Sequence, residues 1–345
     1  MKYFAGIDVS MEESSICVLD PLGAVVFEGK VATEPEAIAE ALSKADCNAA
    51  KIGLEAGALS PWLCHELRAL GYEVICLDCR QVHQFLKVKR NKTDRSDAKG
   101  IAEILRLGAE APVHVKSYDS HAQRALLKTH IELVHIRQDL ENTIRGILKP
   151  FGLRLPRGNR PSLPERVREL CRDFPELEAA TASLLRCRSR VQEELSLVDK
   201  KLAAKVRGDN DCQRLMTVPS IGPITAVAFK SMVDDHGRFA KARAVGAYVG
   251  ITPRRYQSGE VNYMGRISKR GDKMMRTLLY EAATVLLTVV KRFSSLKAWG
   301  LKLAKRIGMK KARVAVARKL AVIMAAILQD GTEFCWNNTT ETTKA

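Results

Sequence analysis

Residues 3–10 read Tyr-Phe-Ala-Gly-Ile-Asp-Val-Ser, an apolar segment with a carboxylate, Asp8, in its middle. A second apolar run at 51–56, Lys-Ile-Gly-Leu-Glu-Ala, closes on Glu55. Both runs have the length and composition of buried strands. A carboxylate inside such a strand is costly unless it is paired, hydrogen-bonded or bound to a metal. If the two strands pair in one sheet, Asp8 and Glu55 meet.

Two more acids follow in the segment 92–98, Lys-Thr-Asp-Arg-Ser-Asp-Ala. Its threonine is a good helix N-cap, so Asp94 and Asp97 fall in the first helical turn, on one face. Acids also favour helix N-termini through the macrodipole, and for this pair alone that is the better interpretation. Gathered with Asp8 and Glu55, however, such acids raise one another's pKa, which a hard divalent cation relieves. The four residues predict a Mg²⁺ or Mn²⁺ site for phosphoryl transfer.

The first hundred residues alternate between strand and helix signals. The expected strands are 2–9, about 14–20, about 24–31, the run ending at Glu55, and 72–78. Three helices are expected. The first covers 34–45, and the third begins near Thr93. The second has Ser60 as its N-cap, Pro61 in its first turn and Gly71 as its C-terminal stop. Three consecutive strands followed by alternating helices and strands predict a mixed sheet, as in a ribonuclease-H-like domain.

The middle of the chain changes to a heptad pattern. Apolar residues recur every seven positions at Leu126, Leu133, Leu140 and Ile147, and again at Leu177, Leu184, Val191 and Val198. A break rich in Pro, Gly and Arg separates the two series at 149–164. The pattern predicts a helical hairpin or coiled coil, serving in dimerisation or as a rigid arm. A helical bundle packed within one subunit is the alternative.

A third region, from about 212 to 330, is mostly helical in pattern. Residues 215–226 form a Gly- and Pro-containing turn before a helix, similar to a helix–hairpin–helix, although an ordinary turn fits equally well. Basic helices are expected at about 270–292 and 308–328, and a frayed tail from Gly331. The chain is therefore expected to divide into the segments 1–115, 116–210, 211–330 and 331–345.

Charge is unevenly distributed along the 345 residues. The formal net charge is +17 and the pI is near 9.6, which favours a polyanionic partner. Residues 1–60 hold ten Asp and Glu against four Lys and Arg, whereas 238–320 hold twenty-one Lys and Arg against three Asp and Glu. An acidic site and a basic surface in different parts of one chain are typical of a nucleic-acid enzyme rather than a membrane-surface binder.

The nine cysteines indicate a reducing compartment. Cys76 and Cys79 form a C-x-x-C without the second pair that a zinc site would need, so reduced thiols are expected. The N-terminus has no signal-peptide pattern, and the apolar stretches near the C-terminus are too short or too interrupted to span a membrane. A cytoplasmic protein without a membrane partner is expected.

A second group of polar residues lies between 250 and 273. Ser258 precedes a glycine in a predicted loop, and several cations are close to it in sequence: Arg254, Arg255, Arg266, Lys269, Arg270 and Lys273. A serine can attack a phosphodiester when positive charge stabilises the transition state and a base removes its proton. A turn serine among phosphate-binding arginines is the commoner arrangement and is favoured on spacing alone. Ser268, Tyr256 and Tyr263 are rival hydroxyls.

Taken together, these motifs resemble the DEDD-type transposases of insertion sequences, the bridge-RNA-guided recombinases. The resemblance covers about residues 3–330 in the family's order. It is carried by Gly6-Ile7-Asp8, Glu55, the 92–98 segment, Pro219-Ser220-Ile221-Gly222-Pro223, and the 250–259 and 265–271 stretches. Ser220 departs from the family, which usually has glycine there.

The resemblance implies a RuvC-like N-terminal domain, a helical coiled-coil arm and a mostly helical transposase domain. It implies that Asp8, Glu55, Asp94 and Asp97 bind Mg²⁺ (or Mn²⁺), and that Ser258 forms a covalent phosphoserine link to DNA. The implied partners are donor and target DNA, a structured guide RNA, and further copies of the chain in a homodimer or homotetramer. The cations near Ser258 would then bind nucleic acid, mainly through backbone and shape.

Three alternatives remain open on the sequence. A metal-dependent nuclease of the Holliday-junction-resolvase kind would use water as nucleophile and leave no covalent adduct. A non-catalytic scaffold for RNA or DNA would tolerate the loss of Asp8. An actin-like or sugar-kinase ATPase is disfavoured, because the Asp-Gly-Gly phosphate loops of those folds are missing.

Overall fold

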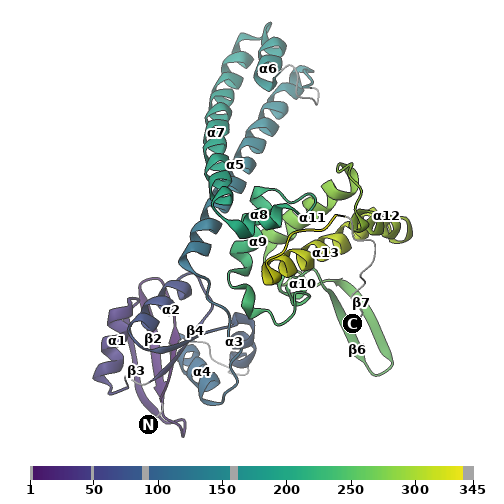
Figure 1. The fold of residues 1–345 in the computed structure, drawn as a ribbon. Coiled ribbons are helices and arrows are strands. Elements are labelled where there is room, and N and C mark those ends of the chain that lie inside the picture. The colour runs from purple at the N-terminus through teal and green to yellow at the C-terminus, as the bar shows by residue number, and fades with distance from the viewer. Residues whose placement is uncertain (1–2, 48–49, 88–92, 156–161, 337–345) are drawn as a thin grey trace. The chain divides into compact units, whose positions relative to one another are not determined.

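The computed structural model divides into two compact units, Met1–Lys116 and Ser117–Ala345, which are described separately (Figure 1). Lys92, residues 156–161 of the predicted break and residues 337–345 of the predicted tail lie outside the described residues. The finer division of the chain into four segments stays a prediction. The described residues are 3–47, 50–87, 93–155 and 162–336.

The first unit is built on a five-stranded mixed sheet in the order β3-β2-β1-β4-β5. β1 pairs antiparallel with β2 and parallel with β4, β2 pairs antiparallel with β3, and β4 pairs parallel with β5. The predicted mixed sheet and its strands are confirmed to within a residue or two. The strands are β1 (Phe4–Asp8), β2 (Glu13–Leu19), β3 (Val25–Ala32), β4 (Lys51–Glu55) and β5 (Glu73–Leu77).

Four helices accompany this sheet: α1 (Pro35–Lys44), α2 (Ser60–Ala69), α3 (Cys79–Leu86) and α4 (Asp94–Arg106). The predicted N-cap of α2 is wrong by one residue, because Leu59 is the N-cap and Ser60 the first helical residue. The Ser60 hydroxyl donates to the Glu55 carbonyl oxygen at 2.5 Å and accepts from the Gly57 N–H at 2.8 Å. It therefore ties the end of β4 to the start of α2. The α3 helix was not predicted.

The α4 helix lies against the sheet at two glycines. A Cβ on Gly6 of β1 would overlap the backbone of Ala98 and Ala102 in α4. A Cβ on Gly53 of β4 would lie 2.8 Å from a methyl carbon of Leu105. Gly6 and Gly53 face each other in the register of the two strands. The glycines thus allow the helix backbone to approach the middle of the sheet more closely than any side chain would permit.

The second unit begins with two long helices, α5 (Tyr118–Leu148) and α7 (Pro175–Arg207). Cross-helix pairs such as Arg137 with Gln192 and Arg188 with Glu141, both at 2.9 Å, show that they run antiparallel, and Figure 1 shows them side by side. Helix α6 (Leu163–Cys171) packs on α5 and α7 at the end where the chain passes from one to the other, and the three helices share a small apolar core there. A helical hairpin is present, whereas supercoiling and dimerisation through it stay predictions.

The remainder of the unit is a helical core with one β-hairpin. The helices are α8 (Asn210–Met216), α9 (Pro223–Val233), α10 (Ala244–Val249), α11 (Lys273–Thr288), α12 (Ser295–Ile307) and α13 (Met309–Asp330), with 3-10 turns η1 (Lys149–Phe151) and η2 (His236–Arg238). Phe229 is completely buried among them. The 270–292 and 308–328 predictions match α11 and α13, whereas α12 was missed.

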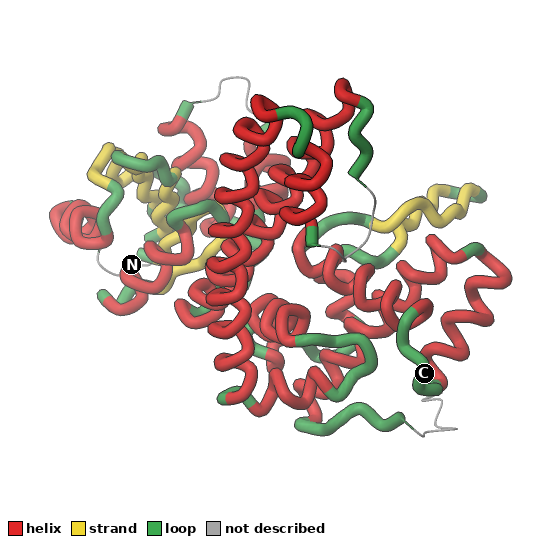
Figure 2. Tube along the Cα trace, turned by 90° about the horizontal axis from the view of Figure 1, so that it is seen from above, coloured by secondary structure: helices red, strands yellow, loops and turns green. Residues whose placement is uncertain are grey.

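The predicted loop around Ser258 is wrong. Residues 253–267 form the antiparallel hairpin of β6 (Pro253–Ser258) and β7 (Val261–Ile267), and Figure 2 shows it as the strand segment of an otherwise helical unit. Every β6 residue and all but the last of β7 are exposed. Strands without a buried face give no alternating hydrophobic pattern, which is why the sequence suggested a loop.

The turn between α8 and α9 contains Ser220 in the left-handed region, with φ 68°. Ion pairs connect the same two helices: Nζ of Lys230 in α9 lies 2.6 Å from Asp209, the N-cap of α8, and 3.3 Å from Asp211 in α8. Glycine adopts such a φ without the steric cost that a Cβ brings. Ser220 therefore carries backbone strain that a glycine at this position would avoid.

None of the helices in the described residues is both long and apolar enough to cross a membrane.

Gly6→Ala should disrupt the contact between α4 and β1. The added carbon overlaps backbone atoms that cannot rotate away, and overpacking of this kind costs about 1–3 kcal/mol. Hydrogen-exchange mass spectrometry should show faster exchange in peptides from β1 and α4. Gly57→Ala is the matched control, because its new carbon would meet ordinary contacts of 3.4 Å or more. Equal exchange in the two variants would contradict the close approach.

Ser220→Gly should stabilise the second unit by about 0.5 kcal/mol. The substitution removes the steric cost of a Cβ in the left-handed region, but glycine also raises the conformational entropy of the unfolded chain, which offsets part of the gain. Calorimetry of the full chain should show a transition about 1–2 °C higher. Ser220→Ala keeps the Cβ and should bring no gain. A gain from alanine equal to that from glycine would assign the effect to the hydroxyl instead.

Candidate functional site

Asp8 and Glu55 lie at the carboxyl ends of neighbouring parallel strands. The register of Gly6 with Gly53 and Ile7 with Leu54, continued by one residue, puts the two acids side by side. Side chains alternate along a strand, so Asp8 projects to the same face as Gly6, and Glu55 to the same face as Gly53. That is the face on which α4 packs. The predicted meeting of the two acids is consistent with this register.

Asp94 and Asp97 begin α4 and lie near the same edge. Ala98, one turn into the helix, packs over Gly6, two residues before Asp8. The Thr93 hydroxyl accepts the Ser96 N–H at 3.1 Å and so fixes the helix start, as predicted. The helix then crosses the sheet, with Ala98 and Ala102 over Gly6 of β1 and Leu105 over Gly53 of β4. We call this group, Asp8, Glu55, Asp94 and Asp97, the acidic edge.

Two cation–carboxylate pairs hold the start of α4 to β3. Lys30 Nζ lies 3.2 Å from Asp94 Oδ2, and Arg95 pairs with Glu28. The hydrogen bond from Arg95 to Glu28, followed by the charge of that carboxylate, raises the pKa of Arg95. The sequence analysis missed Lys30, because an exposed lysine in a strand gives no signal until the pairing of β3 is known.

The donor set of the acidic edge fits a hard divalent cation, because carboxylate oxygens are the ligands that Mg²⁺ and Mn²⁺ prefer. Asp8 and Glu55 line one pocket of about 300 Å³ together with 9–11 and 56–60. In the side-chain positions of the described residues, however, no three His, Cys, Asp or Glu converge closely enough to hold an ion. Asp94 is engaged by Lys30, so binding of a cation by all four acids would require this ion pair to open.

Ser258 is the last residue of β6 and pairs with Val261 across the hairpin. It is exposed, and Gly259 follows in the left-handed region with φ 54°. No hydrogen bond to the Ser258 hydroxyl is formed by the part of the chain that the structure describes. The serine is therefore presented at the hairpin tip without a base from its own unit.

The root of the hairpin is held tightly by backbone contacts. A Cβ on Gly250 would overlap Arg270, and one on Gly271 would overlap Tyr248. Lys269 takes a positive φ of 54°, and its N–H donates to the Gly250 carbonyl oxygen at 3.1 Å. The two ends of the hairpin therefore cross at fixed positions, while its tip remains exposed.

All six predicted nucleic-acid-binding cations are exposed on or beside this hairpin. Arg254 donates to the Ser268 carbonyl oxygen at 3.3 Å, and Arg255 to Asn262 Oδ1 at 3.2 Å. The six are Arg254, Arg255, Arg266, Lys269, Arg270 and Lys273. They give the hairpin and its root positive charge, with Lys269, Arg270 and Lys273 at the root and Ser258 at the tip.

The sequence analysis missed two arginines that make contacts next to the hairpin root. Arg124 of α5 lies 2.5 Å from Asp272, the N-cap of α11 next to the hairpin root. Arg276 donates to the Val249 carbonyl oxygen at 3.0 Å. Neither position carries a local sequence signal, because both contacts join segments far apart in the chain.

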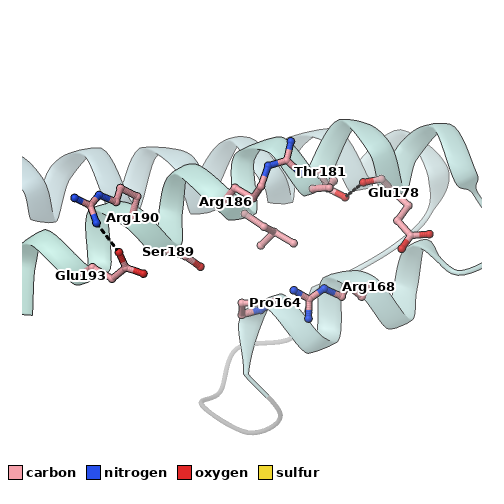
Figure 3. Close-up of a pocket in the computed structure, with 10 residues that line it drawn as sticks. Pro164, Arg168, Glu178, Thr181, Arg186, Ser189, Arg190 and Glu193 are labelled. Atoms are coloured by element: carbon pink, nitrogen blue, oxygen red, sulfur yellow. Dashed lines mark hydrogen bonds and ion pairs between the residues drawn. The ribbon is translucent and has the colours of Figure 1, made fainter.

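A larger pocket, of about 440 Å³, lies between α6 and α7 (Figure 3). Within its lining, Arg190 pairs with Glu193 at 2.9 Å, and the Thr181 hydroxyl donates to the Glu178 carbonyl oxygen at 3.1 Å. It contains none of the predicted site residues, so the chemistry of the acidic edge and the hairpin lies elsewhere.

Comparison with known proteins matches both regions. A family model described as a transposase of the IS110 DEDD type matches residues 5–152, and the model "Transposase IS116/IS110/IS902 family" matches 212–298. A Coxiella burnetii protein, the transposase for insertion sequence element IS1111A, is 31% identical over 94% of this chain and 88% of its own length.

Two further relatives agree with this assignment. A probable family 20 transposase of Pseudomonas aeruginosa is 32% identical over 80% of this chain and 83% of its own length. The transposase for insertion sequence element IS1328 of Yersinia enterocolitica is 29% identical over 84% and 87%. The chain thus belongs to the IS110 family of insertion-sequence transposases, of the DEDD type.

Proposed function

We propose that this transposase cuts and exchanges DNA strands through a covalent bond between Ser258 and DNA, with the acidic edge acting as a Mg²⁺ site. The observation that carries the proposal is the position of Asp8 and Glu55 at adjacent strand ends, beneath a helix that begins with Asp94 and Asp97. A carboxylate at the end of each of two neighbouring buried strands fits a cation-binding role.

The first chemical step is attack of the Ser258 oxygen on the scissile phosphorus. A serine–phosphate bond forms, the bond to the leaving deoxyribose oxygen breaks, the serine proton passes to a base, and the leaving oxygen gains a proton. In the second step a hydroxyl from the other duplex attacks the phosphoserine, which releases Ser258 with its proton. The number of phosphodiester bonds is unchanged, so the exchange needs no external energy source.

The cations of the hairpin would stabilise the charge that builds up on the phosphate oxygens in these steps. Arg254, Arg255 and Arg266 lie on the hairpin itself, and Lys269 and Arg270 at its root. A preorganised cation is most effective where charge develops in the transition state. Mg²⁺, when bound at the acidic edge, would neutralise the scissile phosphate and help to deprotonate a nearby hydroxyl.

The resemblance to the DEDD transposases implies that the acidic cluster of one subunit acts together with the serine of another, here Ser258. Its hydroxyl makes no hydrogen bond within the described residues, and the nearby side chains are mainly cationic. We propose that the acidic edge of another copy of the chain completes the site, in a homodimer or homotetramer. Each active centre would then combine the serine of one copy with the carboxylates of its partner.

We further propose that a structured RNA selects the donor and target DNA by base pairing. The support is the resemblance of the motifs and a net charge of +17, which favours a polyanionic partner. The protein would hold the RNA and both duplexes by shape and backbone.

A second candidate function is favoured by the missing base at Ser258. A metal-dependent nuclease of the resolvase kind would need only the acidic edge and water, and Ser258 would then be a structural residue of the hairpin turn. It would produce free DNA ends without a protein adduct.

Ser258→Ala should abolish the protein–DNA adduct. Protein, guide RNA, Mg²⁺ and labelled donor DNA would be incubated, denatured, and examined for a DNA-shifted band. Ser268→Ala is the matched control and should keep the adduct, because Ser268 lies at the hairpin root and its hydroxyl accepts the Arg270 N–H at 3.4 Å. Cleavage without an adduct that persists in Ser258→Ala would instead support the nuclease.

Asp8→Asn and Glu55→Gln should each weaken Mn²⁺ binding by about tenfold or more, because each removes one charged ligand. The loss of the free Mn²⁺ signal in electron paramagnetic resonance measures this without any activity. Asp46→Asn is the control, since Asp46 is exposed after α1 with φ 53°, a conformation that asparagine tolerates. Unchanged affinity in both variants would remove the metal from the acidic edge.

A further inference from the structure

The hairpin presents two chemically different faces. Because side chains alternate along each strand and cross-strand partners share a face, Ser258, Tyr256, Tyr263 and Val261 lie on one side. The other side carries Arg255, Gln257, Asn262 and Met264, where Arg255 donates to Asn262. The serine therefore shares its face with both tyrosines of the hairpin.

Tyr256 and Tyr263 form a stacked pair directly across the strands. Their ring centroids are 5.5 Å apart, with 24° between the ring planes. The two residues are 59% and 58% exposed, so the pair is not part of the core of its unit. Two aromatic rings held together in solvent offer a broad, flat surface to a ligand.

The charges around the pair indicate a polyanionic ligand. Arg254, Arg255 and Arg266 extend along the hairpin, against a single carboxylate at its tip, Glu260. Aromatic rings on one face of the hairpin, with Arg255 on the other face and Arg254 toward the root, match a nucleic acid strand that stacks a base on the rings and pairs its phosphates with the cations along the hairpin. A protein partner would not require this combination.

We propose that Tyr256 and Tyr263 are a stacking platform for the DNA base next to the phosphate that Ser258 attacks. The inference rests on the proposed function, since it takes DNA as the substrate of Ser258. Tyr256 lies two residues from Ser258, about 7 Å along an extended strand, a separation that one nucleotide spans. Stacking of the neighbouring base would hold the scissile phosphate at the serine.

The platform uses the tyrosine rings and not their hydroxyls. Each ring supports the other, so a base stacked on the outer surface of one meets a surface that is already ordered. Stacking is tolerant of base identity, which suits an enzyme whose target sequence is selected by a guide RNA. The tyrosines are then positioning residues, and the chemistry remains with Ser258.

Photo-crosslinking tests the contact directly. The full chain carrying Ser258→Ala would be mixed with guide RNA and a DNA duplex from the junction of the element, with 5-iododeoxyuracil replacing each thymine in turn. Cross-links to Tyr256 or Tyr263, identified by mass spectrometry, are expected from a base next to the cut. Cross-links only to other residues, only from iodouracil placed in the RNA, or none at all would overturn the platform.

Variants separate the ring from the hydroxyl. Tyr256→Leu and Tyr263→Leu should lower the rate of adduct formation roughly tenfold to a hundredfold, whereas the phenylalanine variants should stay within about threefold. Thermal unfolding should be unchanged in all four, since the rings lie outside the core. Wild-type rates in the leucine variants would overturn the inference.

The outcomes also separate the platform from the proposed function. An adduct that is lost in Ser258→Ala but insensitive to both leucine variants would keep the serine mechanism and remove the platform. Tyrosine cross-links together with an adduct that survives Ser258→Ala would keep the platform and remove the serine. Loss of the adduct in Tyr256→Phe or Tyr263→Phe would make that hydroxyl the nucleophile and contradict both.

Discussion

The close approach of α4 to the sheet is the constraint on which the acidic edge depends. Gly6 and Gly53, paired in neighbouring parallel strands, leave room for the backbone of Ala98 and for Leu105. The helix is fixed there, and ion pairs with Lys30 and Glu28 hold its first turn to β3 of the same sheet. Residues almost ninety positions apart in the sequence thereby come to one edge. A side chain at Gly6 would overlap the backbone of α4 and displace the helix.

The two candidate sites differ in their physical character. The acidic edge is built on a packed sheet and helix, and an exposed ion pair between Lys30 and Asp94 joins the helix start to β3. The hairpin with Ser258 is fixed only at its root by Gly250 and Gly271, and its tip is exposed. Under the proposed function, the sheet and helix would hold the acids in place, and the exposed hairpin would leave Ser258 accessible to nucleic acid.

The sequence predicted those parts of the fold in which local pattern and burial agree. The strands that end at Asp8 and Glu55 are apolar, and Thr93 is the N-cap of α4. The sheet, this helix and the position of the acids within them could therefore be predicted from the sequence. The hairpin could not be predicted, because all of β6 is exposed and its residues follow no apolar alternation. Nor could Lys30, Arg124 or the tyrosine stack, since each depends on a partner that only the fold brings near. Ser220 was visible as an unusual residue, but its positive φ required the structure.

The central claim is that one active centre combines Ser258 of one copy with the acidic edge of another. Mixing the Ser258→Ala and Asp8→Asn proteins tests it most directly, because each lacks one half of the site and retains the other. With guide RNA, Mg²⁺ and donor DNA, the mixture should regain a protein–DNA adduct that neither protein forms alone, and the adduct should lie on the Asp8→Asn chain. A mixture as inactive as its components, or full adduct formation by Asp8→Asn alone, would contradict the account.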